Sequence, residues 1–233
     1  MPGTGYQVSG LTRQRDIRDS KGVKRMPPFE TLLPFFGIAV VLGLTPGPDN
    51  VFVLLQSAMR GPRAGMVVVL GLCTGLLVHT AAVALGLAAL FAASRLAFMV
   101  LKIAGALYLA YLAWQALRAP VGAMGQGNGD KAGVGHMYRR GVVMNLTNPK
   151  VVIFFLAFLP QFVAPDRGHV ALQIMVLGVV FIIATLLVFS VIACCSAMFG
   201  ALLLRSARAQ RALNWFAGVV FLGLAARLAS SRM

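Results

Sequence analysis

Long apolar runs, separated by short polar segments, dominate the hydrophobic pattern of the chain. Six runs stand out, at about 30–57, 65–93, 96–117, 139–163, 170–203 and 212–229. Each is close to or longer than the roughly 20 residues that a helix needs to cross the hydrocarbon core of a membrane. None shows the strict alternation typical of a membrane-spanning β-strand. The pattern predicts an all-α membrane protein with six transmembrane helices.

Two polar segments divide this pattern. Residues 1–28 form a basic N-terminal tail, in which residues 1–25 carry six basic and two acidic side chains. We consider two interpretations of residues 1–25: a short cytoplasmic tail, or a segment that is not translated because the chain starts at Met26. Residues 119–137 are rich in glycine and lack an apolar face, which predicts a flexible linker. The predicted organisation is therefore a three-helix unit at 29–118, this linker, and a second three-helix unit at 138–230.

The first and fourth apolar runs are each interrupted by helix-breaking residues. Residues 45–50 read TPGPDN, and residues 145–150 read NLTNPK. Proline lacks a backbone donor and clashes with the preceding turn, while glycine tolerates conformations outside the helix. Backbone groups freed at membrane depth must be buried in protein or line a cavity. We therefore expect both helices to be broken, although a pair of ordinary proline kinks would give the same residues.

The spacing of the prolines indicates an internal repeat. Pro46 and Pro149 are 103 positions apart, and so are Pro62 and Pro165. An odd number of spans in each half requires the two halves to insert in opposite orientations. Inverted repeats with broken helices are typical of secondary transporters that bind substrate at the repeat interface. The sequence thus predicts two inverted three-helix repeats.

Each interruption carries one ionisable residue, Asp49 in the first and Lys150 in the second. A charge at the centre of a membrane helix costs about 2.5–3.5 kcal/mol on insertion scales, so neither side chain is expected to face lipid. The two residues either pair with each other across the repeat interface or serve an aqueous pathway. The ends of broken helices also favour ions of both signs, which would suit a zwitterionic amino acid.

His79 shares one helix face with Gly71 and Gly75, where small residues let another helix approach closely. A buried histidine there either relays protons or donates a single hydrogen bond. The expected substrate and proton pathway comprises Pro46, Gly47, Pro48, Asp49, His79, Asn148, Pro149 and Lys150. Secondary candidates are Asn50, Gln56, Asn145 and Gln161.

Charge and motif content narrow the function further. The chain has 21 basic and 6 acidic residues, a net charge of +15. In a soluble protein this charge would suggest nucleic acid, but here most of it lies at the ends of spans, so no nucleic-acid partner is expected. The sequence lacks metal-ligand motifs and the GxxxxGK[ST] phosphate loop. We therefore expect neither a metal, a cofactor nor an enzymatic activity.

Several segments together resemble the LysE/RhtB family, the lysine exporter and homoserine-threonine efflux family of amino-acid translocators. They are TPGPDN at 45–50, GLCTGLLVH at 71–79, LKIAGALYLAYLAWQALR at 101–118, NLTNPKVVIFFLAFLPQFV at 145–163 and GVVFLGLAARLA at 218–229. The resemblance implies a multi-pass protein of the bacterial inner membrane that exports an amino acid or related metabolite, with proton exchange as the expected coupling. It places residues 46–49 on the first family signature and residues 148–150 on the second.

Three alternatives stay open at this point. They are an exporter of a metal cation, a thiol-redox membrane carrier, and a membrane scaffold that does not transport. The expected partners are a small amino-acid substrate and the lipid bilayer, and assembly into a homo-oligomer is left open.

Overall fold

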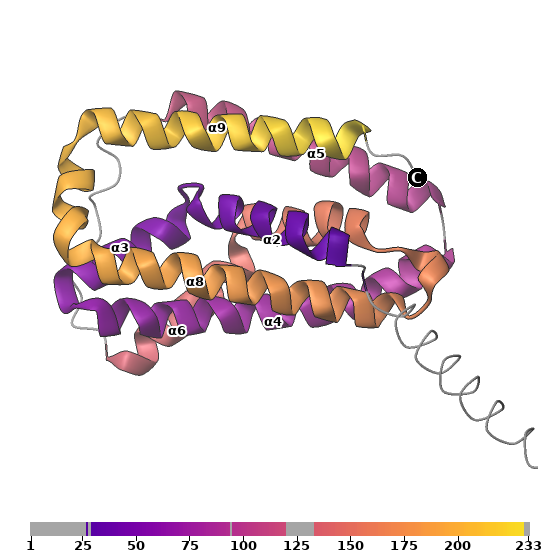
Figure 1. Cartoon of the computed structure of the whole chain (residues 1–233), viewed down its shortest axis with the longest axis horizontal. Coiled ribbons are helices and arrows are strands. Elements are labelled where there is room, and N and C mark those ends of the chain that lie inside the picture. Colours follow the sequence, from indigo (N-terminus) through magenta and orange to yellow (C-terminus); the bar gives the residue numbers. More distant parts are fainter. Residues whose placement is uncertain (1–26, 28, 94, 120–132, 231–233) are drawn as a thin grey trace, which may run out of the picture.

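The computed structural model describes residue 27 and residues 29–93, 95–119 and 133–230, and their regular elements are all helical (Figure 1). The α-helices are α2 (Phe29–Leu44), α3 (Pro48–Arg60), α4 (Pro62–Ala93), α5 (Arg95–Arg118), α6 (Val134–Thr147), α7 (Pro149–Ile153), α8 (Val170–Arg205) and α9 (Ala207–Ser230). A π-helical turn, η2 (Phe154–Phe158), and a 3-10 turn, η3 (Leu159–Phe162), continue α7. A further 3-10 turn, η4 (Pro165–Arg167), precedes α8. The prediction of an all-α protein is confirmed for these residues.

Both predicted helix breaks are present. The axis bends by 63° between Glu30–Leu44 and Pro48–Arg60, and by 49° between Val134–Thr147 and Pro149–Phe162. Among the described residues, three stretches are long and apolar enough to cross a membrane on their own, namely Pro62–Gly86, Val170–Ser196 and Ala207–Ser230. The number rises to five if each bent pair forms one span. The fold is thus a helical membrane protein with three to five candidate spans.

The helix boundaries differ from the sequence expectation at one end of the glycine-rich segment. Helix α6 begins at Val134, so the last four residues of the predicted linker 119–137 are helical. The helix starts here despite Gly135, which has a low helix propensity, so packing of α6 against α4 outweighs the local preference. The tail at 1–25, the alternative start at Met26 and linker residues 120–132 lie outside the described part of the chain.

The helices are arranged in three tiers (Figure 1). Helices α5 and α9 pack side by side along one edge, while α4, α6 and α8 lie along the opposite edge, with α2 and α3 between the two groups. Helix α4 packs against both α6 and α8, and the turn η2 packs against α5. The core between the tiers is aromatic: Phe154 lies 5.0 Å from Phe181 and Phe35 lies 5.1 Å from Phe162, measured between ring centroids. This packing places the two breaks in the layer between the two outer groups of helices.

The glycine face of α4 is the contact surface for α6, as the sequence predicts. A side chain on Gly71 would collide with the backbone of Tyr138, and its Cβ would lie 3.0 Å from the backbone nitrogen of Val142. One turn further along α4, a Cβ on Gly75 would lie 2.6 Å from Oδ1 of Asn145. Two helix backbones can approach this closely only where both faces lack bulky side chains.

Gly71→Ala is therefore expected to force α4 and α6 apart. Overpacking of this kind costs about 1–3 kcal/mol in tightly packed interiors, and here the obstacle is backbone that cannot move aside. The measurement is thermal unfolding of the purified protein in detergent. Gly86→Ala is the matched control, because a Cβ at Gly86 on the same helix meets nothing within 4 Å. Equal unfolding temperatures for the two variants would contradict the assigned contact.

Candidate functional site

The first break exposes backbone carbonyls at the end of α2 because of the position of Pro46. In a continuous helix the carbonyl of Leu42 accepts a hydrogen bond from the N–H four residues later, but Pro46 has none. Gly47 then adopts an extended conformation, with φ −160° and ψ 176°, and Pro48 begins α3. The backbone carbonyls of Leu42, Gly43 and Thr45 are thereby released from the helical ladder.

A polar side chain of the same segment takes up part of this released backbone. The amide Nδ2 of Asn50 donates to the carbonyl of Gly43 at 2.6 Å. The hydroxyl of Thr45 donates at 2.8 Å to the carbonyl of Val41, which also keeps its helical donor, the backbone N–H of Thr45. The carbonyls of Leu42 and Thr45 receive their donor from the other half of the chain.

At the second break, a single proline both removes a backbone donor and begins the next helix. Pro149 removes the N–H that would reach the carbonyl of Asn145, and it also begins the next helix, α7. Oδ1 of Asn148 caps this helix by accepting from the backbone N–H of Lys150 at 3.1 Å. The first break divides these two tasks between Pro46, which frees a carbonyl, and Pro48, which starts the new helix.

The two breaks meet at a buried ion pair between Asp49 and Lys150. The ammonium Nζ of Lys150 lies 3.4 Å from Oδ1 of Asp49, and both side chains are 6% exposed. The same ammonium donates to the carbonyl of Leu42 at 3.4 Å and to that of Thr45 at 3.2 Å. One cation from the second break thus binds three oxygens of the first. Since neither charge is solvated, each depends on the other for its stability.

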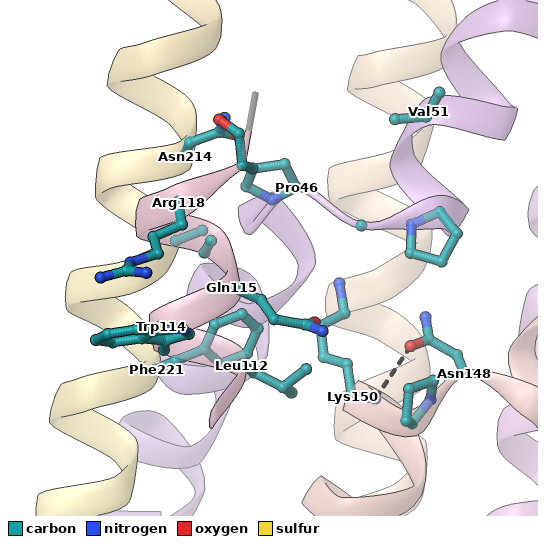
Figure 2. A pocket seen from close by; sticks show the side chains of 16 residues that line it. Pro46, Val51, Leu112, Trp114, Gln115, Arg118, Asn148, Lys150, Asn214 and Phe221 are labelled. Atoms are coloured by element: carbon teal, nitrogen blue, oxygen red, sulfur yellow. Dashed lines mark hydrogen bonds between the residues drawn. The ribbon is translucent and has the colours of Figure 1, made fainter. Parts of the chain in front are cut away.

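A cavity of about 650 Å³ is lined by Lys150 of this pair (Figure 2). Its wall combines the two breaks with α5 and α9, and its lining includes Pro46, Gly47, Asn148, Lys150, Gln115 and Asn214. On the side of α4 and α8, a much smaller pocket of about 20 Å³ is lined by Asp49, Lys150 and mainly apolar side chains. The pair therefore lies between an open cavity and closely packed helices.

Several polar atoms around the pair are buried without a hydrogen-bond partner. They are Nδ2 of Asn148, Oδ1 of Asn145 and Oδ1 of Asn50, whereas the unpartnered Oε1 of Gln56 and Oγ of Ser57 lie in the second half of α3. Burying an unsatisfied polar group costs about 1–3 kcal/mol, so a cluster of them is uncommon in a purely structural core. Their concentration beside the breaks marks this region for binding polar ligands.

The structure brings most of the sequence-predicted candidates together and leaves a few apart. Residues 46–50 and residues 145, 148, 149 and 150 all lie at or beside the paired breaks. Gln161 instead lies in η3, where its amide donates to the carbonyl of Ala157 at 3.5 Å. Gln56 lies in the second half of α3, and it lines neither of the two hollows beside the pair.

His79 contacts the second break but not the ion pair. Its Nε2 lies 3.4 Å from the carbonyl of Asn145, which also accepts from the backbone N–H of Asn148 at 3.1 Å. Its ring lies 5.6 Å from that of Phe155. Because a carbonyl only accepts, Nε2 donates in this contact. We propose that His79 ties α4 to the end of α6 rather than relaying protons.

His79→Gln is expected to keep at least half of the wild-type transport rate and to leave its pH dependence unchanged. The amide of glutamine supplies an equivalent N–H donor for the carbonyl of Asn145. The measurement is transport across pH 5.5–8.5, and His79→Leu, which cannot donate, is the comparison. A shifted pH profile in His79→Gln would instead assign the histidine to proton transfer.

Sequence reasoning missed the contribution of α5 and α9 to the cavity wall. Trp114, Gln115 and Arg118 of α5 and Asn214 and Phe221 of α9 line it (Figure 2). The guanidinium of Arg118 lies 3.7 Å from the ring centroid of Trp114. Gln115 and Asn214 are amides inside the predominantly apolar runs at 96–117 and 212–229, and that pattern is the signal that indicates them.

Comparison with known proteins fits this arrangement of breaks and cavity. The family model described as LysE type translocator matches residues 40–232. The chain belongs to the LysE-type translocator family. The match includes both breaks and the lining of the cavity, so the geometry above is that of a family member.

Individual relatives cover almost the whole chain. The homoserine/homoserine lactone efflux protein of Salmonella typhimurium is 33% identical over 204 residues, which is 88% of this chain and 98% of that protein. The protein of the same name from Salmonella typhi gives the same values. An uncharacterised membrane protein of Pseudomonas aeruginosa is 32% identical over 204 residues, 84% of this chain and 93% of that protein. No solved structure matches the chain.

Family membership and the apolar helices together define the class of protein. The chain is a multi-pass protein of the bacterial cytoplasmic membrane and an exporter of an amino acid or a closely related metabolite. The three cysteines at 73, 194 and 195 are free thiols. Within the described residues, no group of three His, Cys, Asp or Glu side chains is placed to hold a metal ion.

Proposed function

We propose that this exporter is a secondary transporter with six spans in two inverted repeats, which binds the amino group of its substrate at the paired helix breaks. The observation that carries the proposal is the buried pair of Asp49 and Lys150, whose lysine lines the cavity. Charges at this depth are expensive, so they are retained where they contact a substrate or ion pathway.

The pattern of helix contacts supports the inverted repeat. Exchanging the halves turns α2–α3 into α6–α7, α4 into α8 and α5 into α9. Under that exchange the contact of α4 with α6 becomes the contact of α8 with α2, and both are present. Helix α4 also packs against its own counterpart α8, and α5 against its own counterpart α9. Contacts of this kind lie across the two-fold axis that would relate the halves.

The names of the relatives help to define the substrate class. Homoserine and homoserine lactone share a primary amino group, whereas the lactone has no free carboxylate. A site that accepts both must therefore recognise the ammonium first. Asp49 and the released carbonyls of α2 are oxygen acceptors suited to an ammonium, so we propose that the substrate is a small amino acid or amino lactone.

The chemistry of the same pair supports proton exchange as the coupling. A proton on the carboxylate of Asp49 removes its attraction for an ammonium, so protonation and amine binding are mutually exclusive. Rocking of one repeat against the other would then present Asp49 to each side of the membrane in turn. A proton entering on one side would release the amine on that side.

The test is efflux of a panel of isotope-labelled compounds from bacterial cells with and without the gene. The panel contains homoserine, homoserine lactone, other small amino acids, and the 2-hydroxy acids that match them. We expect faster efflux of at least one primary amine and no change for the hydroxy acids. Equal efflux of every compound with and without the gene would contradict the proposed function.

A further inference from the structure

We propose that the end of α2 and Asp49 form a binding site for a primary ammonium, which Lys150 occupies in this structure as a built-in ligand. The amino group of the substrate takes the place of the Lys150 ammonium when it binds. The inference rests on the proposed function for the identity of that amine. The site itself follows from the contacts of Lys150 and can be tested separately.

The number and type of the acceptors match a primary ammonium. Nζ of Lys150 has three N–H donors and faces three oxygens, those of Leu42 at 3.4 Å, Thr45 at 3.2 Å and Asp49 at 3.4 Å. Two of the acceptors are backbone carbonyls released by the break. The third is a carboxylate that supplies the opposite charge. All three belong to the first half of the chain, so they form one site even when the lysine withdraws.

The contacts hold the ammonium loosely. Charge-assisted hydrogen bonds between an ammonium and an oxygen are usually about 2.7–2.9 Å long. Each of the three contacts of Nζ is at least 0.3 Å longer than the upper end of that range. A loosely held ligand on a flexible side chain is displaced more readily than one in short, aligned hydrogen bonds.

Gly47 lies between the cavity and this site. Both Gly47 and Lys150 line the cavity of about 650 Å³, so the lysine has space into which it can withdraw. A Cβ at Gly47 would lie 2.6 Å from Oδ1 of Asp49 and 3.2 Å from Nζ of Lys150. The missing side chain therefore leaves the ion pair directly adjacent to the cavity. Nδ2 of Asn148, a buried donor without a partner, lies in the same wall and can meet a substrate carboxylate.

Exchange of one ammonium for another keeps the charge of the site constant. The carboxylate of Asp49 is never left unpaired, which avoids the large cost of an isolated buried charge. A 2-hydroxy acid, which carries a hydroxyl in place of the ammonium and is an anion at neutral pH, cannot make this exchange, because it would displace the cation without replacing it. The site therefore selects a primary amine because its ligand must replace the ammonium of Lys150.

The experiment uses Lys150→Ala, which empties the site and leaves a space the size of n-propylammonium. We expect n-propylammonium at about ten times its Kd to raise the unfolding temperature of this purified variant by roughly 3–5 °C. Tetramethylammonium carries the same charge but has no N–H, and we expect it to have no effect. The response should disappear in Asp49→Asn/Lys150→Ala, while Lys102→Ala on α5 controls for the loss of a lysine elsewhere.

The wild-type protein tests the exchange itself. Its tethered lysine competes with added amine, so the same temperature shift should need at least a tenfold higher concentration of n-propylammonium. Equal responses to the two cations in Lys150→Ala, or no response to the amine in the wild type, would overturn the proposal. If Lys150→Ala does not fold, Lys150→Ser provides the same empty site with a smaller change in polarity.

Failure of this inference and failure of the proposed function give different results. Amine binding is measured on purified protein and needs no transport. Export without amine-dependent stabilisation would remove the ammonium site and leave the exporter. Stabilisation without efflux of any primary amine would leave the site and remove the proposed substrate class.

Discussion

Asp49→Asn is expected to lower export of the substrate amine at least a hundredfold and to destabilise the protein. The substitution keeps the shape of the side chain but leaves the ammonium of Lys150 buried without a counter-charge. Breaking a buried pair in this way costs about 3–5 kcal/mol. The measurements are efflux per molecule of folded protein and thermal unfolding in detergent.

The double variant Asp49→Asn/Lys150→Gln separates the two effects. It removes both charges, and the amide of glutamine can still donate to one of the carbonyls of Leu42 and Thr45. Replacing a buried ion pair by neutral groups is often close to neutral for stability. We therefore expect the double variant to recover most of the unfolding temperature while export stays absent.

A membrane scaffold would behave differently in the same experiment. For a scaffold, the charges matter for folding alone, so recovery of stability would bring recovery of all function. Export by the double variant at more than a tenth of the wild-type rate per molecule would exclude Asp49 and Lys150 from the transport mechanism. Unchanged stability in Asp49→Asn would show that the two charges do not depend on each other.

The helices and the two breaks follow from properties that a sequence carries locally. Apolar length predicts the long helices, and proline removes a backbone donor wherever it occurs, so both interruptions were predictable to within a few residues. The pairing of Asp49 with Lys150 was one of two predicted roles, because few charges were placed at membrane depth. The face of Gly71 and Gly75 was predictable for the same reason, since small residues spaced by four define a contact surface.

The parts of the site that were not predictable depend on chain segments distant in sequence. The carbonyls of Leu42 and Thr45 act as ligands through the backbone, so no residue type identifies them. The contribution of α5 and α9 depends on how those helices pack against the breaks, which no local pattern encodes. The sequence predicts two roles for His79 because its partner is a backbone carbonyl, that of Asn145, which no residue type identifies.

The two breaks are also less alike than the spacing of their prolines indicates. Pro46 and Pro149 each remove the donor for a carbonyl four residues earlier, which is the equivalence that the spacing detects. Pro149 is also the first residue of the following helix, and at the first break that position belongs to Pro48. The two additional residues at the first break include Gly47, the residue without a side chain beside the ion pair.

Gly47→Ala is accordingly expected to lower export about tenfold or more while the protein still folds. The backbone of Gly47 is extended, a conformation that alanine adopts freely, so the effect does not come from backbone strain. It comes from the added methyl group, which would lie 2.6 Å from Oδ1 of Asp49 and must displace that carboxylate. Overpacking of this kind costs about 1–3 kcal/mol.

Gly37→Ala is the matched control, because it adds the same methyl group to α2 at a position where nothing lies within 4 Å. Replacing glycine by alanine in an open helical position usually adds about 0.5–1 kcal/mol of stability, so this control should fold at least as well as the wild type and export at its rate. Measuring efflux and unfolding for both variants separates the space beside the ion pair from any general effect of removing a glycine. Wild-type export by Gly47→Ala would mean that the substrate reaches Asp49 without passing Gly47, and the entry route would then have to lie elsewhere in the cavity wall.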